Sequence, residues 1–246
     1  MSVLRDFLLA FADDEHLIGQ HHTEWIGTAP FLEEDLAFSS IGQDELGHAA
    51  LLYELVLDVD GVPSDDLAID QLAFFRSADA YRSSALAEYS TTDWAEALVR
   101  HWIYDAAEQL RWANVASSSH QGLAETAARA QREEVYHRLH ADSLLDALLG
   151  AAEARERIHS ALDRLLPLAP SVLAAVHDEA DLVSAGVIVQ RTDQLVDEFA
   201  SVIEARFSRS VALIVPGAGR AERSASFVPL MARMREVFDL DPAAIW

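Results

Sequence analysis

Two short stretches of the sequence decide the expected fold: Gln43-Asp44-Glu45-Leu46-Gly47-His48 and Glu133-Glu134-Val135-Tyr136-His137-Arg138. Each contains the pattern Glu-x-x-His, whose two side chains lie three residues apart and therefore share one face of a helix. A carboxylate precedes the glutamate of each pattern at nearly the same distance, Glu15 by 30 residues and Asp105 by 29. This internal repeat predicts two similar helical hairpins, each with a carboxylate on its first helix and Glu-x-x-His on its second.

The apolar residues around these stretches recur with the period of a helix, and no long alternating pattern typical of a strand occurs. We expect an all-α protein with four principal helices at about 2–25, 30–58, 93–116 and 122–149. Short links within each pair and a longer link at 59–80 predict two antiparallel hairpins docked into a ferritin-like four-helix bundle. We expect one domain, with the core bundle in 1–150 and additional C-terminal helices in 151–246, near 152–176, 180–209 and 224–237.

Local signals place the ends of these helices and one loop. Pro30 suits the first position of the second helix, and Asp93 with Glu96 predicts a capping box at the start of the third. Gly150 is expected to end the fourth helix. The glycine-rich stretch 215–220 is expected to be a flexible loop.

The composition excludes several classes of function. The 246 residues include 18 basic residues, all of them Arg, against 41 acids, which gives a formal net charge of −23. Such a charge repels nucleic acid. The absence of Cys rules out disulfides, thiol catalysis and iron–sulfur ligation. No apolar stretch approaches the roughly 20 residues needed to span a bilayer. We expect a soluble cytoplasmic protein that binds neither nucleic acid nor membrane.

The chemistry is expected where acids and histidines interrupt the apolar stripe of each principal helix. Burying several carboxylates together is prohibitive unless cations neutralise them, and two divalent metal ions would balance four carboxylates. Di-iron carboxylate bundles have this arrangement of ligands, and mixed carboxylate and imidazole donors suit iron or manganese. On the third helix the spacing leaves both Asp105 and Glu108 possible. The candidates are Glu15, Glu45, His48, Asp105 or Glu108, Glu134 and His137.

Other polar side chains around this set have two interpretations each. Asp44 and Glu133 each precede a candidate glutamate and either hold a ligand histidine from behind or are solvated acids. His101 and His22 lie on the inner stripe and serve either in proton transfer or as core histidines.

Two further patterns need separate interpretations. A third pattern, Glu156-x-x-His159, has no matching carboxylate upstream, and we interpret it as a surface coincidence. Aromatic residues expected on the inner faces form either a substrate pocket or ordinary core. They are Phe11, Trp25, Trp102 and Tyr136.

Three motifs carry a resemblance to a known family. Residues 43–48 with the following Ala-Ala-Leu-Leu-Tyr, the stretch Trp102-Ile103-Tyr104-Asp105, and residues 133–138 resemble helices of the ferritin-like phenylacetyl-CoA epoxidase (phenylacetic acid catabolic) family. The resemblance favours Asp105 over Glu108. The length and the ending from Phe227-Val-Pro-Leu-Met231 to Ala-Ile-Trp246 are similar to the partner subunit of that family, whose role is structural. The resemblance implies two iron ions held by Glu15, Glu45, His48, Asp105, Glu134 and His137.

The resemblance also implies an activity and its partners. A di-iron oxygenase subunit would activate dioxygen and oxygenate or epoxidise an aromatic or related acyl-CoA substrate, with electrons from a separate reductase. It would work as a homodimer or as a heteromer with a homologous ferritin-like subunit. Arg220 and Arg223, in the less acidic C-terminal part, are candidates for CoA phosphates or else for a surface contact. The alternatives are a scaffold subunit and a ferritin-like di-metal oxidase or peroxidase without organic substrate.

Overall fold

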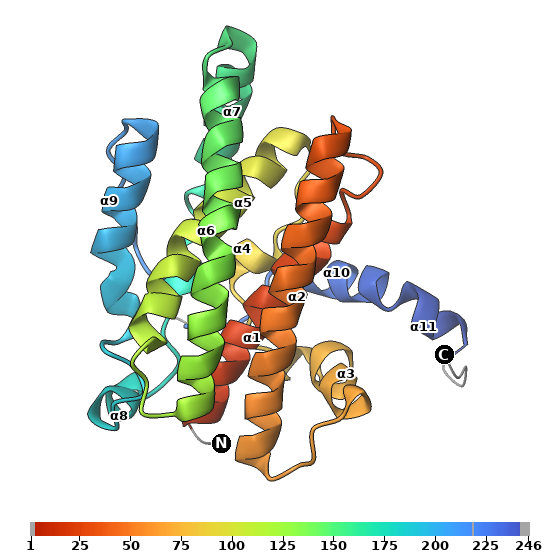
Figure 1. The fold of residues 1–246 in the computed structure, drawn as a ribbon, viewed down its shortest axis with the longest axis vertical. Coiled ribbons are helices and arrows are strands. Elements are labelled where there is room, and N and C mark those ends of the chain that lie inside the picture. The colour runs from red at the N-terminus through yellow and green to blue at the C-terminus, as the bar shows by residue number, and fades with distance from the viewer. Residues whose placement is uncertain (1–2, 218, 242–246) are drawn as a thin grey trace.

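A computed structural model describes residues 3–217 and 219–241, coloured by position in Figure 1. The first two residues, Ala218 in the predicted loop and the Ala-Ile-Trp ending lie outside the described residues. The part of the chain that the structure describes forms eleven α-helices and three short 3-10 helices, and it contains no strand. The predicted all-α fold is confirmed.

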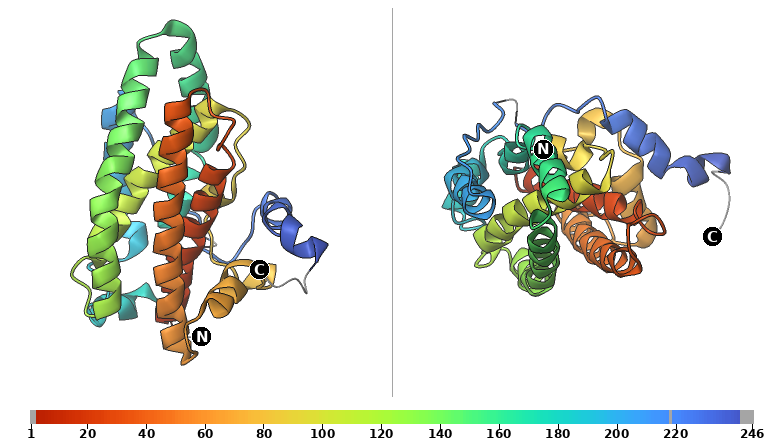
Figure 2. Two further views of the ribbon diagram at one scale, coloured as in Figure 1. Left: turned by 45° about the vertical axis from the view of Figure 1, so that its right-hand side comes forward. Right: turned by 90° about the horizontal axis from the view of Figure 1, so that it is seen from above.

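Four long helices form the predicted bundle. They are α1 (Val3–Thr23), α2 (Leu32–Asp60), α5 (Trp94–Val115) and α6 (Gln121–Leu149). Helix α1 packs along α2, α5 packs along α6, and α2 lies against α6, so that the two hairpins face each other. Figure 1 and both views of Figure 2 show α2 and α6 side by side along the bundle. The ferritin-like arrangement of two docked hairpins is therefore present.

The helix ends correct two local predictions. Helix α2 begins at Leu32 after the extended residue Phe31, so Pro30 does not occupy its first position. The chain is still turning there, because the Asp35 side chain accepts hydrogen bonds from the backbone N–H groups of Gly27 and Ala29. Asp93 caps α5, but its proposed partner in the capping box bonds elsewhere. Glu96 accepts a hydrogen bond from the Thr92 N–H, so only half of the capping box forms.

Gly150 directly follows the end of α6, as predicted. The connection between the hairpins contains α3 (Asp66–Phe74), the 3-10 helix η1 (Ala78–Ala80) and α4 (Ala85–Glu88).

The C-terminal part is more broken than the periodicity predicts. Its elements are α7 (Ala152–Leu165), η2 (Ala169–Leu173), α8 (Glu179–Ser184), η3 (Thr192–Leu195), α9 (Val196–Phe207), α10 (Phe227–Met234) and α11 (Glu236–Leu240). Pro167 and Pro170 cannot donate backbone hydrogen bonds, so a helix over 152–176 ends early. Gly186, at φ +71°, lies just beyond the end of α8. The apolar period predicts helices here correctly, but these residues divide them into shorter pieces.

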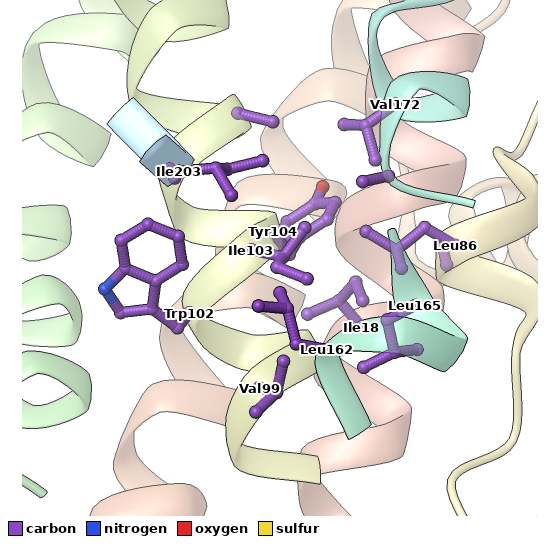
Figure 3. Packing of buried hydrophobic residues seen from close by; sticks show 14 of the residues in the cluster. Ile18, Leu86, Val99, Trp102, Ile103, Tyr104, Leu162, Leu165, Val172 and Ile203 are labelled. Atoms are coloured by element: carbon purple, nitrogen blue, oxygen red, sulfur yellow. The ribbon is translucent and has the colours of Figure 1, made fainter. Parts of the chain in front are cut away.

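The C-terminal helices cover the outer side of α5. Figure 3 shows Leu162 and Leu165 of α7 and Ile203 of α9 packed against Val99 and Ile103 of α5. These apolar side chains are almost fully buried, and they separate the interior of the bundle from water on that side. Among the described residues, no helix combines the length and the apolar character that a bilayer crossing requires.

Candidate metal centre

Seven acids and histidines from α1, α2, α5 and α6 meet inside the bundle. Their potential ligand atoms fall into three overlapping groups, and within each group all atoms lie within 4.8 Å of one another. Six of the seven are the side chains predicted from the repeat, and the seventh is Glu108, which the spacing had left open. The seven are Glu15, Glu45, His48, Asp105, Glu108, Glu134 and His137, each at most 1% exposed.

Most of these carboxylate oxygens have no hydrogen-bond partner. Among the described residues, neither oxygen of Glu45, Asp105 or Glu134 accepts a hydrogen bond, and neither does Oε2 of Glu108. Buried polar atoms are almost always paired, and a buried carboxylate without a partner is strongly unfavourable. The cluster could therefore hold cations, and it is too well buried to be a patch of solvated acids.

His48 lies between the carboxylates of the first hairpin and Glu133, an acid on the outer side of the cluster. Its Nδ1 lies 3.3 Å from Oε2 of Glu15 and 3.8 Å from Oε2 of Glu45. Its Nε2 lies 2.8 Å from Oε2 of Glu133, on the outer side. One ring nitrogen thus faces the cluster while the other faces a supporting carboxylate, an arrangement that fixes the orientation of a metal-binding imidazole.

His137 has the corresponding position in the second hairpin. Its Nδ1 lies 3.0 Å from Oε1 of Glu134 and 3.7 Å from Oε1 of Glu45. Its Nε2 lies 3.3 Å from Oδ2 of Asp44. Asp44 and Glu133 therefore contact the histidines, and each supports the histidine of the opposite hairpin.

Two aromatic side chains that the sequence analysis did not single out as site residues donate hydrogen bonds to the cluster. The Tyr104 hydroxyl donates to Oε1 of Glu15 at 2.6 Å, and the Trp112 indole N–H donates to Oε1 of Glu108 at 2.6 Å. Both are fully buried. A signal was present, because buried tyrosine and tryptophan usually direct their polar atom to a partner. Trp112 follows Glu108 by four residues, on the same face of α5.

Histidines cluster on the side of Asp105. His101 Nδ1 lies 3.1 Å from Oδ1 of Asp105, and the His22 ring meets the His101 ring edge-on with centroids 5.0 Å apart. Burial, together with the nearby His101, holds the pKa of His22 well below its usual value. His22 is therefore a neutral core histidine beside the centre.

The carboxylates do not titrate alike. Burial and the neighbouring charges of Glu108 and Glu15 raise the pKa of Glu45, and burial with the charges of Glu134 and Glu15 raises the pKa of Glu108. Burial opposes the charged form of Glu15 as well, but the hydrogen bond with His48 outweighs it and lowers the pKa to about 2. Without metal, the cluster therefore holds protons that a cation would displace.

The histidines of the cluster are drawn toward their charged forms. Burial lowers the pKa of His137, but the contacts with Asp44 and Glu134 reverse this effect and raise it to about 10. The pKa of His48 is raised as well, because Glu15 outweighs the effect of burial. In both imidazoles these contacts favour the charged form, so a metal ion would compete with a proton at each ring.

The four aromatic residues expected on the inner faces, as a pocket or as core, lie mostly apart from the cluster. Tyr136 is 71% exposed, because it follows Glu134 by only two residues and so points to the opposite side of α6. Trp102 packs against Phe207, away from the cluster. Trp25 packs against Trp94, and only Phe11 lies at the edge of the centre, with its ring 4.0 Å from that of Trp112.

The remaining candidates lie elsewhere. Glu156 and His159 belong to α7, where Glu156 is exposed, consistent with a surface coincidence. Arg220 is 4% exposed, and its guanidinium donates to Asp14 at 2.6 Å and to the backbone carbonyl of Ala174.

Arg223 bonds to Glu88 at 2.6 Å and to Ser83. A buried guanidinium needs such partners. Arg220 and Arg223, the candidates for CoA phosphates or a surface contact, thus tie the C-terminal segment to the bundle.

Two cavities help to locate possible ligands. The larger, about 680 Å³, lies beside α8 and the 215–221 segment and shares no residue with the cluster. A smaller pocket of about 230 Å³ between α5 and α6 is lined by Gln109, Trp112, Gln131 and Glu134. Because Glu134 belongs to the cluster, this smaller pocket lies beside the centre.

Comparison with known proteins gives two findings. A family model described as "Phenylacetic acid catabolic protein" matches residues 2–246. The chain is also similar to one of the subunits of 1,2-phenylacetyl-CoA epoxidase of Escherichia coli (strain K12). The two are 27% identical over 183 residues, which cover 74% of this chain and 71% of the relative.

Proposed function

Because the chain belongs to the phenylacetic acid catabolic protein family, we propose that it is an oxygenase subunit that holds two iron ions in the buried cluster. One observation carries the proposal: seven side chains that could ligate a metal converge from four helices, and most of their carboxylate oxygens have no hydrogen-bond partner among the described residues. A subunit with only a structural role would need none of them, and burying them costs stability. The similarity to an epoxidase subunit supports the same class of reaction.

The donor set fits two divalent metal ions. Glu15, Glu45 and His48 would serve one ion and Asp105, Glu134 and His137 the other, with Glu45 close to both histidines. The four carboxylates among these six residues match the charge of two divalent ions. Carboxylate and imidazole together suit iron or manganese better than magnesium, which prefers oxygen alone. When bound, two irons would supply the electrons that reduce dioxygen.

The protein itself would orient the ligands and keep bulk water out. Glu133 and Asp44 hold the two histidines from outside, so that Nδ1 of each faces the centre. The Tyr104 hydroxyl fixes Glu15. The pocket between α5 and α6 gives small molecules a route to Glu134. At about 230 Å³ it is smaller than the roughly 300–1,000 Å³ of typical ligand sites, so only the reacting end of a substrate would enter.

The substrate and partners follow from the relative rather than from the site. We propose an aromatic or related acyl-CoA thioester as substrate, because the E. coli relative is named for phenylacetyl-CoA. A separate reductase would supply electrons, and a homologous ferritin-like subunit would complete the oxygenase. The exposed apolar side chains on α2 and α6 suit such a protein contact. They include Leu32, Leu36, Tyr136 and Leu139.

A scaffold role is the second candidate, and the enclosed centre favours it. The cavity of about 680 Å³ lies away from the cluster, and the pocket that reaches Glu134 is small. A scaffold subunit would bind a catalytic subunit and leave chemistry to it. In that case Glu45→Ala in this chain would leave the turnover of the assembled enzyme unchanged.

Metal content tests the proposal most directly. The purified protein is expected to contain two iron ions per chain, with a Mössbauer spectrum of paired iron, and Glu134→Ala is expected to contain at most one. Protein that takes up no iron, or equal uptake by Glu134→Ala, would contradict a metal centre at this place. With metal established, the turnover of the Glu45→Ala complex decides between the catalytic and scaffold roles.

A further inference from the structure

We propose that Glu108 is a seventh ligand of the metal centre and that it makes the two metal positions unequal. The inference rests on the proposed two-metal centre and deepens it. With the six predicted donors alone, each hairpin would supply the same set: one carboxylate from its first helix, and one glutamate and one histidine from its second. Glu108 adds a fifth carboxylate that has no counterpart in the first hairpin.

The position of Glu108 supports a ligand role. It belongs to a group with Glu15, Glu45 and His48, and also to a group with Asp105 and Glu134. Its Oε1 lies 3.9 Å from Nδ1 of His48, the ring nitrogen that faces the cluster. Glu108 therefore lies between the two halves of the centre.

The hydrogen bonding of Glu108 leaves one oxygen for a metal. The Trp112 indole N–H donates to Oε1 at 2.6 Å and so fixes the rotation of the carboxylate. Oε2 has no hydrogen-bond partner among the described residues, and the side chain is fully buried. A single neutral donor is a poor partner for a buried carboxylate, whereas an adjacent cation would satisfy the free oxygen.

The corresponding position in the first hairpin shows how specific this feature is. Ile18 follows Glu15 by three residues, as Glu108 follows Asp105. Figure 3 shows Ile18 within the apolar packing between α1, α5 and α7. An isoleucine therefore suffices to fill this position in the repeat, and a carboxylate there is an addition that burial alone would disfavour.

The extra donor distinguishes the two positions. Around His48, four donors lie within 4.8 Å of one another: Glu15, Glu45, Glu108 and His48 itself. On the other side the donors do not form one group of four but two groups of three: Glu45 with Glu134 and His137, and Asp105 with Glu108 and Glu134. The position next to His48 is therefore the one that fills first and binds more tightly.

Cobalt titration of the metal-free full-length protein tests the inference. The wild type is expected to take up two Co(II) ions, one in a tight phase and one in a weaker phase. Calorimetry and the visible absorption of cobalt measure the two phases. Glu108→Gln preserves volume and the acceptor for Trp112 but removes the charge. We expect it to weaken the tight phase at least about 100-fold and to change its absorption spectrum, because the loss of a ligand should equal or exceed the ~10–100-fold loss typical of residues that only support ligands.

Two controls separate the possible causes. Glu96→Gln removes another buried carboxylate of α5, one that bonds to Thr92 and contacts none of the cluster, and should leave both phases unchanged. Thermal unfolding of metal-free Glu108→Gln should show no loss of stability, because a buried charge has been removed.

Two equal phases in the wild type, or a shift below about threefold in Glu108→Gln with an unchanged spectrum, would overturn the ligand role while leaving the two-metal centre intact. A wild type that binds no cobalt would instead count against the proposed function itself.

Discussion

The two hairpins place the same types of metal-ligating residue in different surroundings. On the side of Glu15 and His48, the neighbours are hydrogen-bond donors that are not charged: the Tyr104 hydroxyl and the Trp112 indole. The Trp112 ring also lies 5.6 Å from that of His48. This half therefore has fixed neutral donors, one to Glu15 and one to Glu108.

On the side of Asp105 the neighbours are imidazoles. His101 lies next to Asp105, His22 packs against His101, and His140 continues the line to Glu34, whose carboxylate is 2.9 Å from the His140 ring. The comparison teaches that a repeated ligand spacing does not produce equivalent metal positions. The surroundings of each half come from side chains of the same four helices at positions where the two repeats differ in sequence, and they set its electrostatics.

The largest effect is expected where the two halves meet, at Glu45. It lies within 4 Å of both His48 and His137, so its replacement disturbs both positions at once. Glu45→Gln should reduce the metal content from two ions to at most one, as measured by elemental analysis. The same change should raise the free energy of unfolding of the metal-free protein by about 1–3 kcal/mol, because it removes a buried carboxyl group whose ionisation is opposed by burial and by the neighbouring carboxylates.

Glu96→Gln is the matched control for the expected effect of Glu45→Gln on the free energy of unfolding. Glu96 is also buried, but it is paired with Arg164 and accepts hydrogen bonds from Thr92. Its replacement should lower stability and leave metal content unchanged. If Glu45→Gln destabilised the metal-free protein as much as Glu96→Gln, the cluster would not be under electrostatic strain.

The next prediction compares how much Tyr104 and His101, which contact the carboxylates of the two halves, contribute to stability. Tyr104→Phe removes the O–H that bonds to Glu15 at 2.6 Å, a hydrogen bond to a charged group. We expect a loss of about 2 kcal/mol in the unfolding free energy of the metal-free protein, measured by chemical denaturation. His101→Phe should cost less, because neither His101 nitrogen makes a hydrogen bond with a described residue. Equal losses would show that the two surroundings are energetically alike.

The pH dependence of stability should separate metal-free from metal-loaded protein. The pKa of His137 is raised to about 10 by Asp44 and Glu134 against the effect of burial. A raised pKa contributes stability that is complete below the unfolded value near 6.5 and is lost as the pH rises through about 10. Metal-free protein should therefore become easier to unfold with urea across this range.

Metal binding should remove this dependence. A bound imidazole is neutral, so the loaded protein should show little change over the same pH range, and metal uptake should release protons to the buffer. His137→Gln should flatten the profile of the metal-free protein. Stability that instead increased with pH in the metal-free wild type would contradict the charged state of His137.

The sequence predicted the donors because their positions depend only on helix geometry. Glu45 and His48 are three residues apart and must share a face, and Glu134 and His137 repeat the spacing. The same geometry could have excluded Tyr136, which follows Glu134 by two residues. Spacing cannot predict contacts between helices. It suggested that Asp44 and Glu133 support histidines, but not that each acid contacts the histidine of the opposite hairpin.

The breaks in the C-terminal part show a different limit. Periodicity correctly predicted helical segments after Gly150, but a proline costs a backbone donor whatever the apolar pattern around it. The intramolecular contacts of Arg220 and Arg223 were missed for a related reason. Net charge along the sequence indicated free cations, whereas pairing with Asp14 and Glu88 depends on tertiary packing.

The smallest expected effect concerns the two acids that each contact the histidine of the opposite hairpin. Glu133 belongs to α6 but contacts His48 of α2 at 2.8 Å, whereas Asp44 of α2 contacts His137 of α6 at 3.3 Å. Glu133→Gln should weaken metal binding at the position next to His48 about 10-fold. Asp44→Asn should have a smaller effect at the other position, because its contact is longer and its side chain is more exposed.

Proton NMR of the cobalt-loaded protein can assign each effect to one position. The Nε2 proton of each bound histidine should give its own shifted, exchangeable resonance, and Glu133→Gln should alter only that of His48. Arg129→Gln is the control, because Arg129 contacts Glu133 from the surface without touching either histidine. If Glu133→Gln altered the His137 resonance instead, each hairpin would support its own histidine. The two halves would then be independent units, not interlocked through α2 and α6.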